Sequence, residues 1–250
     1  MQEAFFFGPS GQHIFASYHP PDGGVGEVLT VVCPPLFSEY QRTHPALREM
    51  ALMLAQVGQH VLRVDYRGTG DSLGELEQYS ISDWVDDIAQ AVREGKEISG
   101  CNAVRLLSVR ASALIACKFM GTSSDVQRLV MWDPVTDGAA YVQELRRAQV
   151  DLCRRNHYLD RSERREVQGE YAGHALSALM VEELDALDAN TYARIPPEKM
   201  RAVTTSDYGF SVQGVVCERA AFRCDWDSLA TEMIVPRPVM ERLVECLIQP

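Results

Sequence analysis

The histidines and cysteines are the side chains of this sequence best suited to nucleophilic, acid–base or metal chemistry. The six histidines stand at positions 13, 19, 44, 60, 157 and 174, so the chain beyond residue 174 contains none. The seven cysteines are an odd number, and no two are spaced as C-x-x-C. No Cys/His cluster has the ligand spacing of a zinc site, so we predict neither a metal nor a cofactor. We interpret the cysteines as reduced, mostly buried thiols, which predicts a cytoplasmic protein.

Charge and hydropathy exclude several classes of partner. The net charge of −11 comes from 24 basic and 35 acidic residues. With no basic stripe, this balance argues against a nucleic acid as partner. No apolar run approaches the ~18 residues of a membrane span, and residues 1–11 lack the basic start of a signal peptide. A length of 250 residues suits one large α/β domain better than two independent ones.

Apolar runs that alternate with amphipathic segments predict the elements that must position any site. Runs of strand length cover residues 4–7, 14–18, 28–33, 60–64, 104–109 and 126–132. Helical patterns lie at residues 47–55, with Gly58 just past the end, at residues 85–92, with Ser82 as N-cap, and at residues 111–119. The alternation predicts βαβ units and a parallel sheet, preceded by two antiparallel strands.

The chain after the last of these strands divides into two parts. Residues 137–189 are helical in pattern and rich in charge, with no clear strand, which predicts an inserted cap or lid. Short β-like pieces return at residues 202–205 and 212–216, and a last helix is expected near residues 240–248. We therefore predict a core formed by residues 1–136 and 191–250, with a helical cap at residues 137–190.

Four motifs, in this order, resemble a known superfamily. Residues 65–72 (DYRGTGDS) are similar to the D-x-R-G-x-G-x-S segment after the fourth strand of α/β-hydrolases. Residues 84–91 (WVDDIAQA) resemble the helix that follows it in serine aminopeptidase-like members. Residues 132–135 (WDPV) with Gly138, and residues 170–177 (EYAGHALS) with 184–188 (LDALD), resemble the exosortase A system-associated hydrolases, particularly the second type.

The resemblance covers the chain from about residue 5 to 190 and is weaker beyond. It implies the α/β-hydrolase fold, with a mostly parallel central sheet, flanking helices and a helical cap insertion. It also implies a role in an envelope- or polysaccharide-related system.

The nucleophile position implied by this resemblance holds an arginine. In the α/β-hydrolase fold a G-x-S-x-G turn follows the fifth strand and exposes the nucleophilic serine at a helix N-terminus. The aligned residues are SVRAS, with Arg110 in place of the serine and with Ser108 and Ser112 in place of the glycines. A guanidinium is protonated at any accessible pH and cannot attack a carbonyl carbon.

The general base is missing as well. The triad order in this fold is serine, then an acid, then a histidine after the last strand. Asp133 and Asp207 follow expected strands and are candidates for the acid, but no histidine follows residue 174. We therefore predict a triad-deficient protein that binds a ligand or a partner without ordinary serine-hydrolase chemistry.

An active hydrolase with a nonstandard constellation is the alternative. Ser108, Ser112 or Ser38 would then attack, with His44 or His174 as base. Cys117 lies within the helix after the elbow and is predicted to be a core thiol. A purely structural subunit with an interface on its cap helices is the third hypothesis.

Two interpretations of Arg110 remain open from the sequence. In the first, Arg110 and Ala111 at a helix N-terminus bind an acyl or anionic ligand, together with Leu36, Phe37 and Ser38 from the loop that supplies oxyanion-hole amides in relatives. In the second, Arg110 pairs internally with an acid such as Asp133 or Glu39 and fills a defunct pocket.

Overall fold

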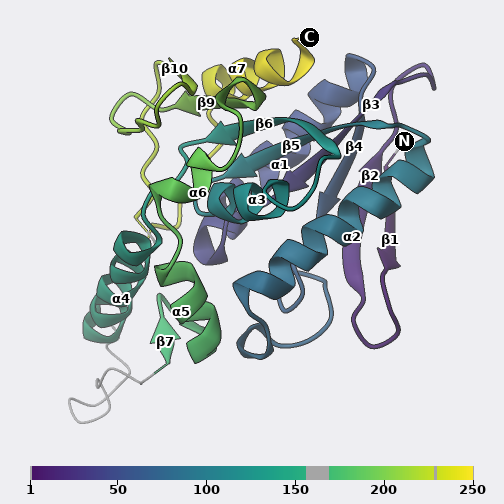
Figure 1. Ribbon diagram of the computed structural model, residues 1–250. Coiled ribbons are helices and arrows are strands. Elements are labelled where there is room, and N and C mark those ends of the chain that lie inside the picture. The colour runs from purple at the N-terminus through teal and green to yellow at the C-terminus, as the bar shows by residue number, and fades with distance from the viewer. Residues whose placement is uncertain (1, 156–168, 228–229, 250) are drawn as a thin grey trace.

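The computed structural model describes residues 2–155, 169–227 and 230–249 and contains a mixed eight-stranded sheet (Figure 1). The strand order is β1-β2-β4-β3-β5-β6-β9-β10. β1 pairs antiparallel with β2 and β2 antiparallel with β4, and every other neighbouring pair is parallel. The predicted mostly parallel sheet with two antiparallel strands at its start is thus confirmed. The strands are β1 Glu3–Phe7, β2 Ile14–His19, β3 Val28–Cys33, β4 His60–Val64, β5 Ala103–Val109, β6 Val126–Trp132, β9 Met200–Thr204 and β10 Val216–Arg219.

Four helices cover the two faces of the sheet, because its central strands are apolar on both sides. α2 (Ile81–Ser99) and α3 (Ser112–Met120) pack together on one face, where Trp84, Ile88 and Leu114 are fully buried. α1 (Phe37–Gln56) and α7 (Arg237–Ile248) pack together on the other face. In parallel strands joined by helices, the loops at the carboxyl ends lie along one edge, and the site residues come from that edge.

Two helix starts differ from the sequence prediction. α1 begins at Phe37, ten residues before the expected start at residue 47, and contains Pro45. Pro45 removes one hydrogen bond to the carbonyl of Gln41, an exposed residue, so solvent can take the place of the missing donor. α2 has Ser80 rather than Ser82 as its N-cap, in a capping box with Asp83. Both expected starts were placed too late in the chain.

Between β6 and β9 the chain leaves the sheet, and we call residues 137–190 the cap segment. It contains α4 (Gly138–Arg155), β7 (Glu170–Tyr171), β8 (His174–Ala175), α5 (Ala178–Asp185) and the start of α6 (Ala189–Ala193). A 3₁₀ turn, η2 (Pro197–Lys199), follows, and another, η1 (Leu76–Gln78), precedes α2. Residues 156–168 lie outside the described part of the chain.

The expectation that the cap segment contains no strand was wrong. Strands β7 and β8 form a hairpin in which Tyr171 pairs with His174. The two residues between them, Ala172 and Gly173, have φ values of 48° and 84°. Positive φ at both positions fits a type I′ turn, which joins two-residue hairpins. Strands this short carry too few alternating side chains to be recognised in the sequence.

The cap segment is held together internally by a close backbone approach, and polar contacts join it to the sheet domain. Gly138 donates its backbone N–H to the carbonyl of Leu187 at 2.8 Å, and a Cβ there would lie 1.9 Å from the carbonyl oxygen of Leu184. Glu183 on α5 accepts hydrogen bonds from the backbone N–H and the hydroxyl of Ser82, at 2.7 and 2.6 Å. Its carboxylate thus lies in the first turn of α2, where a negative charge is favourable. Among the described helices, none is long and apolar enough to cross a lipid bilayer.

Candidate functional site

The turn between β5 and α3 has the strained backbone that a nucleophile elbow requires, and Arg110 is at its tip. Arg110 has a φ of 56°, a conformation that costs a non-glycine residue on the order of 1–3 kcal/mol. Its backbone N–H donates to the carbonyl of Trp132 at 2.9 Å, and the hydroxyl of Ser112 lies 2.9 Å from the carbonyl of Cys33. These contacts hold the strained turn at the carboxyl end of β5, where it presents a guanidinium.

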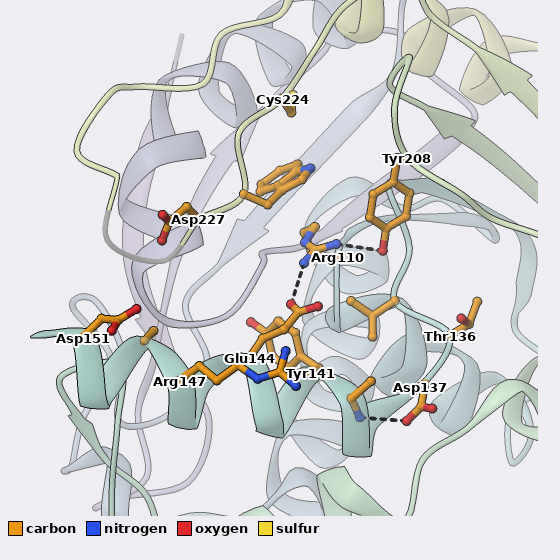
Figure 2. Close-up of a pocket in the computed structure, with 14 residues that line it drawn as sticks. Arg110, Thr136, Asp137, Tyr141, Glu144, Arg147, Asp151, Tyr208, Cys224 and Asp227 are labelled. Atoms are coloured by element: carbon orange, nitrogen blue, oxygen red, sulfur yellow. Dashed lines mark hydrogen bonds and ion pairs between the residues drawn. The ribbon is translucent and has the colours of Figure 1, made fainter. Parts of the chain in front are cut away.

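The guanidinium of Arg110 is bound by protein groups on three nitrogens, and Figure 2 shows two of the partners, Tyr208 and Glu144. Nε donates to Oε1 of Glu39 at 2.9 Å, Nη1 donates to the hydroxyl of Tyr208 at 2.7 Å, and Nη2 lies 3.6 Å from Oε2 of Glu144. Only 4% of Arg110 is exposed. Burial acts to lower the pKa of Arg110, but Glu39, Tyr208 and Tyr141 more than offset it and raise that pKa. Arg110 therefore stays charged at every accessible pH.

Three aromatic rings surround the same guanidinium. The Cζ atom of Arg110 lies 5.1 Å from the ring centroids of both Tyr208 and Trp226 and 5.9 Å from that of Tyr141. Tyr141 also donates its hydroxyl to Oε2 of Glu39 at 3.1 Å, so both oxygens of this buried carboxylate have partners. The structure thus contains the ion pair of the internal-pairing interpretation, and Glu39 rather than Asp133 is the partner.

Asp133 is fully buried at the carboxyl end of β6, with a φ of 41°. Its Oδ1 accepts the backbone N–H of Thr205 at 2.8 Å, and its Oδ2 accepts the Thr205 hydroxyl at 2.9 Å and the indole N–H of Trp226 at 2.8 Å. Trp226 comes from the loop after β10, the region where the fold places a histidine. The indole N–H therefore meets a buried carboxylate as the Nδ1–H of a triad histidine would. Asp207, the other acid candidate, pairs with Arg223 at the surface.

The serines considered as substitute nucleophiles are buried. Ser112 is fully buried, and its hydroxyl lies within hydrogen-bond distance of the carbonyls of Cys33 and Val109 and of the Val109 N–H. Ser108 is also fully buried within β5. The hydroxyls of Ser108 and Ser38 have no hydrogen-bond partner among the described residues, and both oxygens are inaccessible. Burial keeps these hydroxyls away from a substrate as the structure stands.

His44 is held in a form that cannot accept a proton readily. Nη2 of Arg63 lies 2.8 Å from Nε2 of His44. Because arginine only donates, Nε2 must accept, and the proton of the neutral ring is then on Nδ1. Burial first, and then the charge of Arg63, lower the pKa of His44. His44 lies within α1.

A cavity of about 480 Å³, here called the aromatic cavity, contains several of the predicted ligand-binding residues. Leu36, Phe37, His44 and His174 line it, as does Trp84. The ring of His174, from β8, lies 5.4 Å from that of Phe37, and burial lowers the pKa of His174. The cap segment thus contributes one wall of this cavity.

Arg110 lines a separate cavity of about 520 Å³, here called the polar cavity. The two cavities share no lining residue. The sequence analysis grouped Arg110 with Leu36 and Phe37, and the structure separates them. Ala111 is fully buried at the start of α3. The polar cavity is lined by Arg110, Val135, Thr136, Asp137, Ala140, Tyr141, Glu144, Arg147, Ala148, Asp151, Tyr208, Cys224, Trp226 and Asp227 (Figure 2).

Sequence reasoning missed the aromatic residues that enclose Arg110. Tyr141 is on α4, Tyr208 follows β9, and Trp226 follows β10, so no local motif groups them. One signal was present, because Trp226 is in the segment after the last strand, where a histidine was sought. Cys117 is buried in α3 as predicted, and burial raises the pKa of its thiol.

No protein-family model matches the chain, and a search of curated proteins finds no significant match. Among solved structures, Est1E from Butyrivibrio proteoclasticus with bound ferulic acid aligns with a TM-score of 0.66 and 14% identity over 98% of both chains. A thioesterase domain from the curacin biosynthetic pathway aligns with a TM-score of 0.58 and 12% identity over 100% of both chains. XC6422 from Xanthomonas campestris, described as an α/β serine hydrolase without a lid, aligns with a TM-score of 0.56 and 13% identity over 98% of this chain and 89% of that one.

Identity this low shows the fold and not the activity. The strand order, the elbow after β5 and these likenesses together establish that the chain has the α/β-hydrolase fold.

Proposed function

We propose that this chain is a non-hydrolytic protein of the α/β-hydrolase fold that binds an uncharged, mainly apolar ligand in its aromatic cavity. One observation carries the proposal: the nucleophile position holds Arg110, paired with buried Glu39 at 2.9 Å. A serine mechanism needs a nucleophile, a base and an oriented acid. Here the nucleophile position holds a cation, and the buried acid Asp133 accepts an indole N–H that cannot take up a proton.

The aromatic cavity favours an uncharged, mainly apolar ligand because rings form much of its lining and three of its polar side chains already have partners. The Tyr40 hydroxyl donates to Asp65, the Thr69 hydroxyl donates to the Tyr66 carbonyl at 2.8 Å, and Nε2 of His44 accepts from Arg63. A ligand there meets the apolar surface of rings such as Phe37 and Trp84, and the buried hydroxyl of Tyr66 has no hydrogen-bond partner among the described residues. A cavity of this size accepts a small acyl chain or an aromatic ring system.

The ligand expected from the sequence is retained only in part. Arg110 is bound by Glu39, Tyr208 and Glu144, so the proposal keeps the acyl ligand of the sequence analysis and not the anionic one. The solved neighbours include a thioesterase domain and a protein with bound ferulic acid, which are compatible with an acyl or aromatic ligand. The link to an envelope- or polysaccharide-related system remains a prediction from the resemblance.

Two measurements test the proposal. We expect no fluorophosphonate labelling and no hydrolysis of short p-nitrophenyl esters above background. We also expect the neutral fluorescent probe N-phenyl-1-naphthylamine to bind. Leu76→Trp should reduce that binding by filling the aromatic cavity, whereas Leu73→Trp, at an exposed position outside the lining, should not.

Stoichiometric labelling of any serine contradicts the non-hydrolytic half of the proposal and supports the alternative of a nonstandard hydrolase. Equal probe binding by wild type and Leu76→Trp contradicts the ligand half. The two halves therefore fail separately.

A further inference from the structure

Most polar side chains at the aromatic cavity are already bound by the protein. Tyr40 and Thr69 donate their hydroxyls to protein oxygens, and the carboxylate of Glu75 accepts a backbone N–H in the capping box of η1. Nε2 of His44 accepts from Arg63. The main hydrogen-bonding demand of these four lining side chains is thus met before any ligand enters.

His174, from β8, is the exception. It lines the cavity and is half-buried, and its side chain has no hydrogen-bond or ion-pair partner among the described residues. The hydroxyl of Tyr66 also lacks a partner, but that oxygen is inaccessible, whereas the ring nitrogens of His174 are not. Burial lowers the pKa of His174, so at pH 7 its neutral ring carries one N–H donor and one acceptor nitrogen.

The ring of His174 ends a row of aromatic rings along the cavity wall. Its centroid lies 5.4 Å from that of Phe37, and the Phe37 centroid lies 6.3 Å from that of Trp84. Trp84 in turn stacks on Tyr66 at 4.9 Å with 16° between the ring planes. Such a wall favours a planar apolar ligand. At His174 that ligand meets an accessible polar group with unused hydrogen-bonding capacity.

The backbone, and not a polar contact of the imidazole, fixes the position of His174. Its residue pairs with Tyr171 across the tight turn of the β7–β8 hairpin. Three residues later the hydroxyl of Ser177 donates to the carbonyl of Tyr79 at 2.9 Å, which joins this part of the cap segment to the turn before α2. The imidazole is therefore held at the cavity wall with its nitrogens free for a ligand, so little ordering is needed on binding.

We propose that His174 forms a hydrogen bond with a hydroxyl group of the ligand, and that the ligand of the aromatic cavity is a phenol or another aromatic alcohol. No contact among the described residues fixes which ring nitrogen carries the proton. A hydroxyl both donates and accepts and so pairs with either tautomer, whereas a carbonyl pairs only with an N–H. This inference rests on the proposed function, because it assigns the ligand class of the same cavity.

Two probes of similar shape test the inference: 2-naphthol, which is neutral at pH 7, and 2-methylnaphthalene. Their dissociation constants are measured by displacement of N-phenyl-1-naphthylamine. The ratio of the two constants is the readout, because a hydroxyl is better hydrated than a methyl group and the ratio in the wild type includes that difference. We expect His174→Phe to shift the ratio about fivefold against 2-naphthol, equivalent to one lost hydrogen bond of about 1 kcal/mol.

Two further variants guard this result. His174→Leu removes the polar ring without adding another aromatic one, and it should shift the ratio in the same direction and by a similar factor. Gln41→Met removes an exposed, uncharged polar side chain from the same lining and should leave the ratio unchanged. Thermal melts confirm that each variant is folded.

An unchanged ratio in either folded His174 variant overturns the inference, and so does an equal shift in Gln41→Met. If both naphthalene probes bind and the ratio is unchanged, the inference fails while the proposed function stands. If no neutral probe binds the wild type, the ligand half of the proposed function fails and the inference fails with it.

Discussion

At the scale of single residues, the turn after β5 combines a strained backbone with a buried ion pair. Arg110 has the positive φ of a nucleophile turn, yet its side chain is bound by Glu39 and Tyr208. Trp226 donates to Asp133 where a histidine N–H would be expected. Each of these side chains is a hydrogen-bond or ion-pair partner of another, so a substitution at one of them leaves its partner unpaired.

Removal of Arg110 by itself should leave the buried carboxylate of Glu39 without its ion-pair partner. We expect Arg110→Met to lower the free energy of unfolding by about 3–5 kcal/mol, measured by urea denaturation. Adding Glu39→Leu should recover most of this loss, because an apolar replacement of both partners leaves no unpaired charge, although the Tyr141 hydroxyl then loses its acceptor. A single variant that loses less than about 1 kcal/mol would contradict the buried pair.

Three substitutions together should make the turn after β5 reactive, provided that its backbone conformation is kept. Arg110→Ser places a hydroxyl at the strained turn, Trp226→His places a base against Asp133, and Glu39→Gln removes the carboxylate left without its cation. We expect the triple variant to be labelled by a fluorophosphonate, as followed by mass spectrometry. Further addition of Asp133→Asn should slow labelling strongly, because the histidine loses its orienting acid. A folded triple variant that remains unlabelled would show that these positions do not form a triad frame.

At the scale of elements, the packing of α4 against α5 within the cap segment depends on a close backbone approach. Gly138 starts α4 where a Cβ would meet the Leu184 carbonyl at 1.9 Å. A side chain at position 138 would collide with backbone atoms, which cannot move aside as the end of a flexible side chain would.

We therefore expect Gly138→Ala to separate α4 from α5 or to destabilise the protein by about 1–3 kcal/mol. Gly121→Ala is the matched control, because a Cβ there lies 3.5 Å from its nearest neighbour and the backbone φ is ordinary. Thermal melts and limited proteolysis of both variants measure the difference. Equal behaviour of the two variants would contradict the packing described here.

At the scale of the whole molecule, buried histidines make stability depend on pH. His19 in β2 is almost fully buried, and burial, then Arg63, lowers its pKa from 6.5 to about 4. Between these two values unfolded His19 binds a proton that folded His19 does not, so the contribution of His19 to stability rises with pH across this window.

As the pH falls from 6.5 to 4, we expect the contribution of His19 to cost the protein about 2 kcal/mol, after allowance for screening by solvent. Urea denaturation at a series of pH values measures this slope. His19→Gln should flatten it without removing it, because burial also lowers the pKa of His44, His60 and His174. An unchanged slope in His19→Gln would contradict the assignment.

The sequence by itself determined the class of fold. Apolar runs of strand length and amphipathic helices are local patterns, so β3 to β6 and α3 were predictable within a few residues, whereas α2 extends beyond the expected residues 85–92 at both ends. An arginine at position 110 and the lack of any histidine after residue 174 are also visible without a structure.

Only the tertiary structure decided which groups meet. Glu39, Tyr141, Tyr208 and Trp226 come from four separate segments, and the strand order brings them to the carboxyl edge of the sheet around Arg110. The choice of Glu39 over Asp133 as the partner depends on a cost that no local pattern records: each buried charge must find a partner within a few ångströms. For the same reason the division into an aromatic and a polar cavity, which separates Phe37 from Arg110, could not be predicted from the order of residues along the chain.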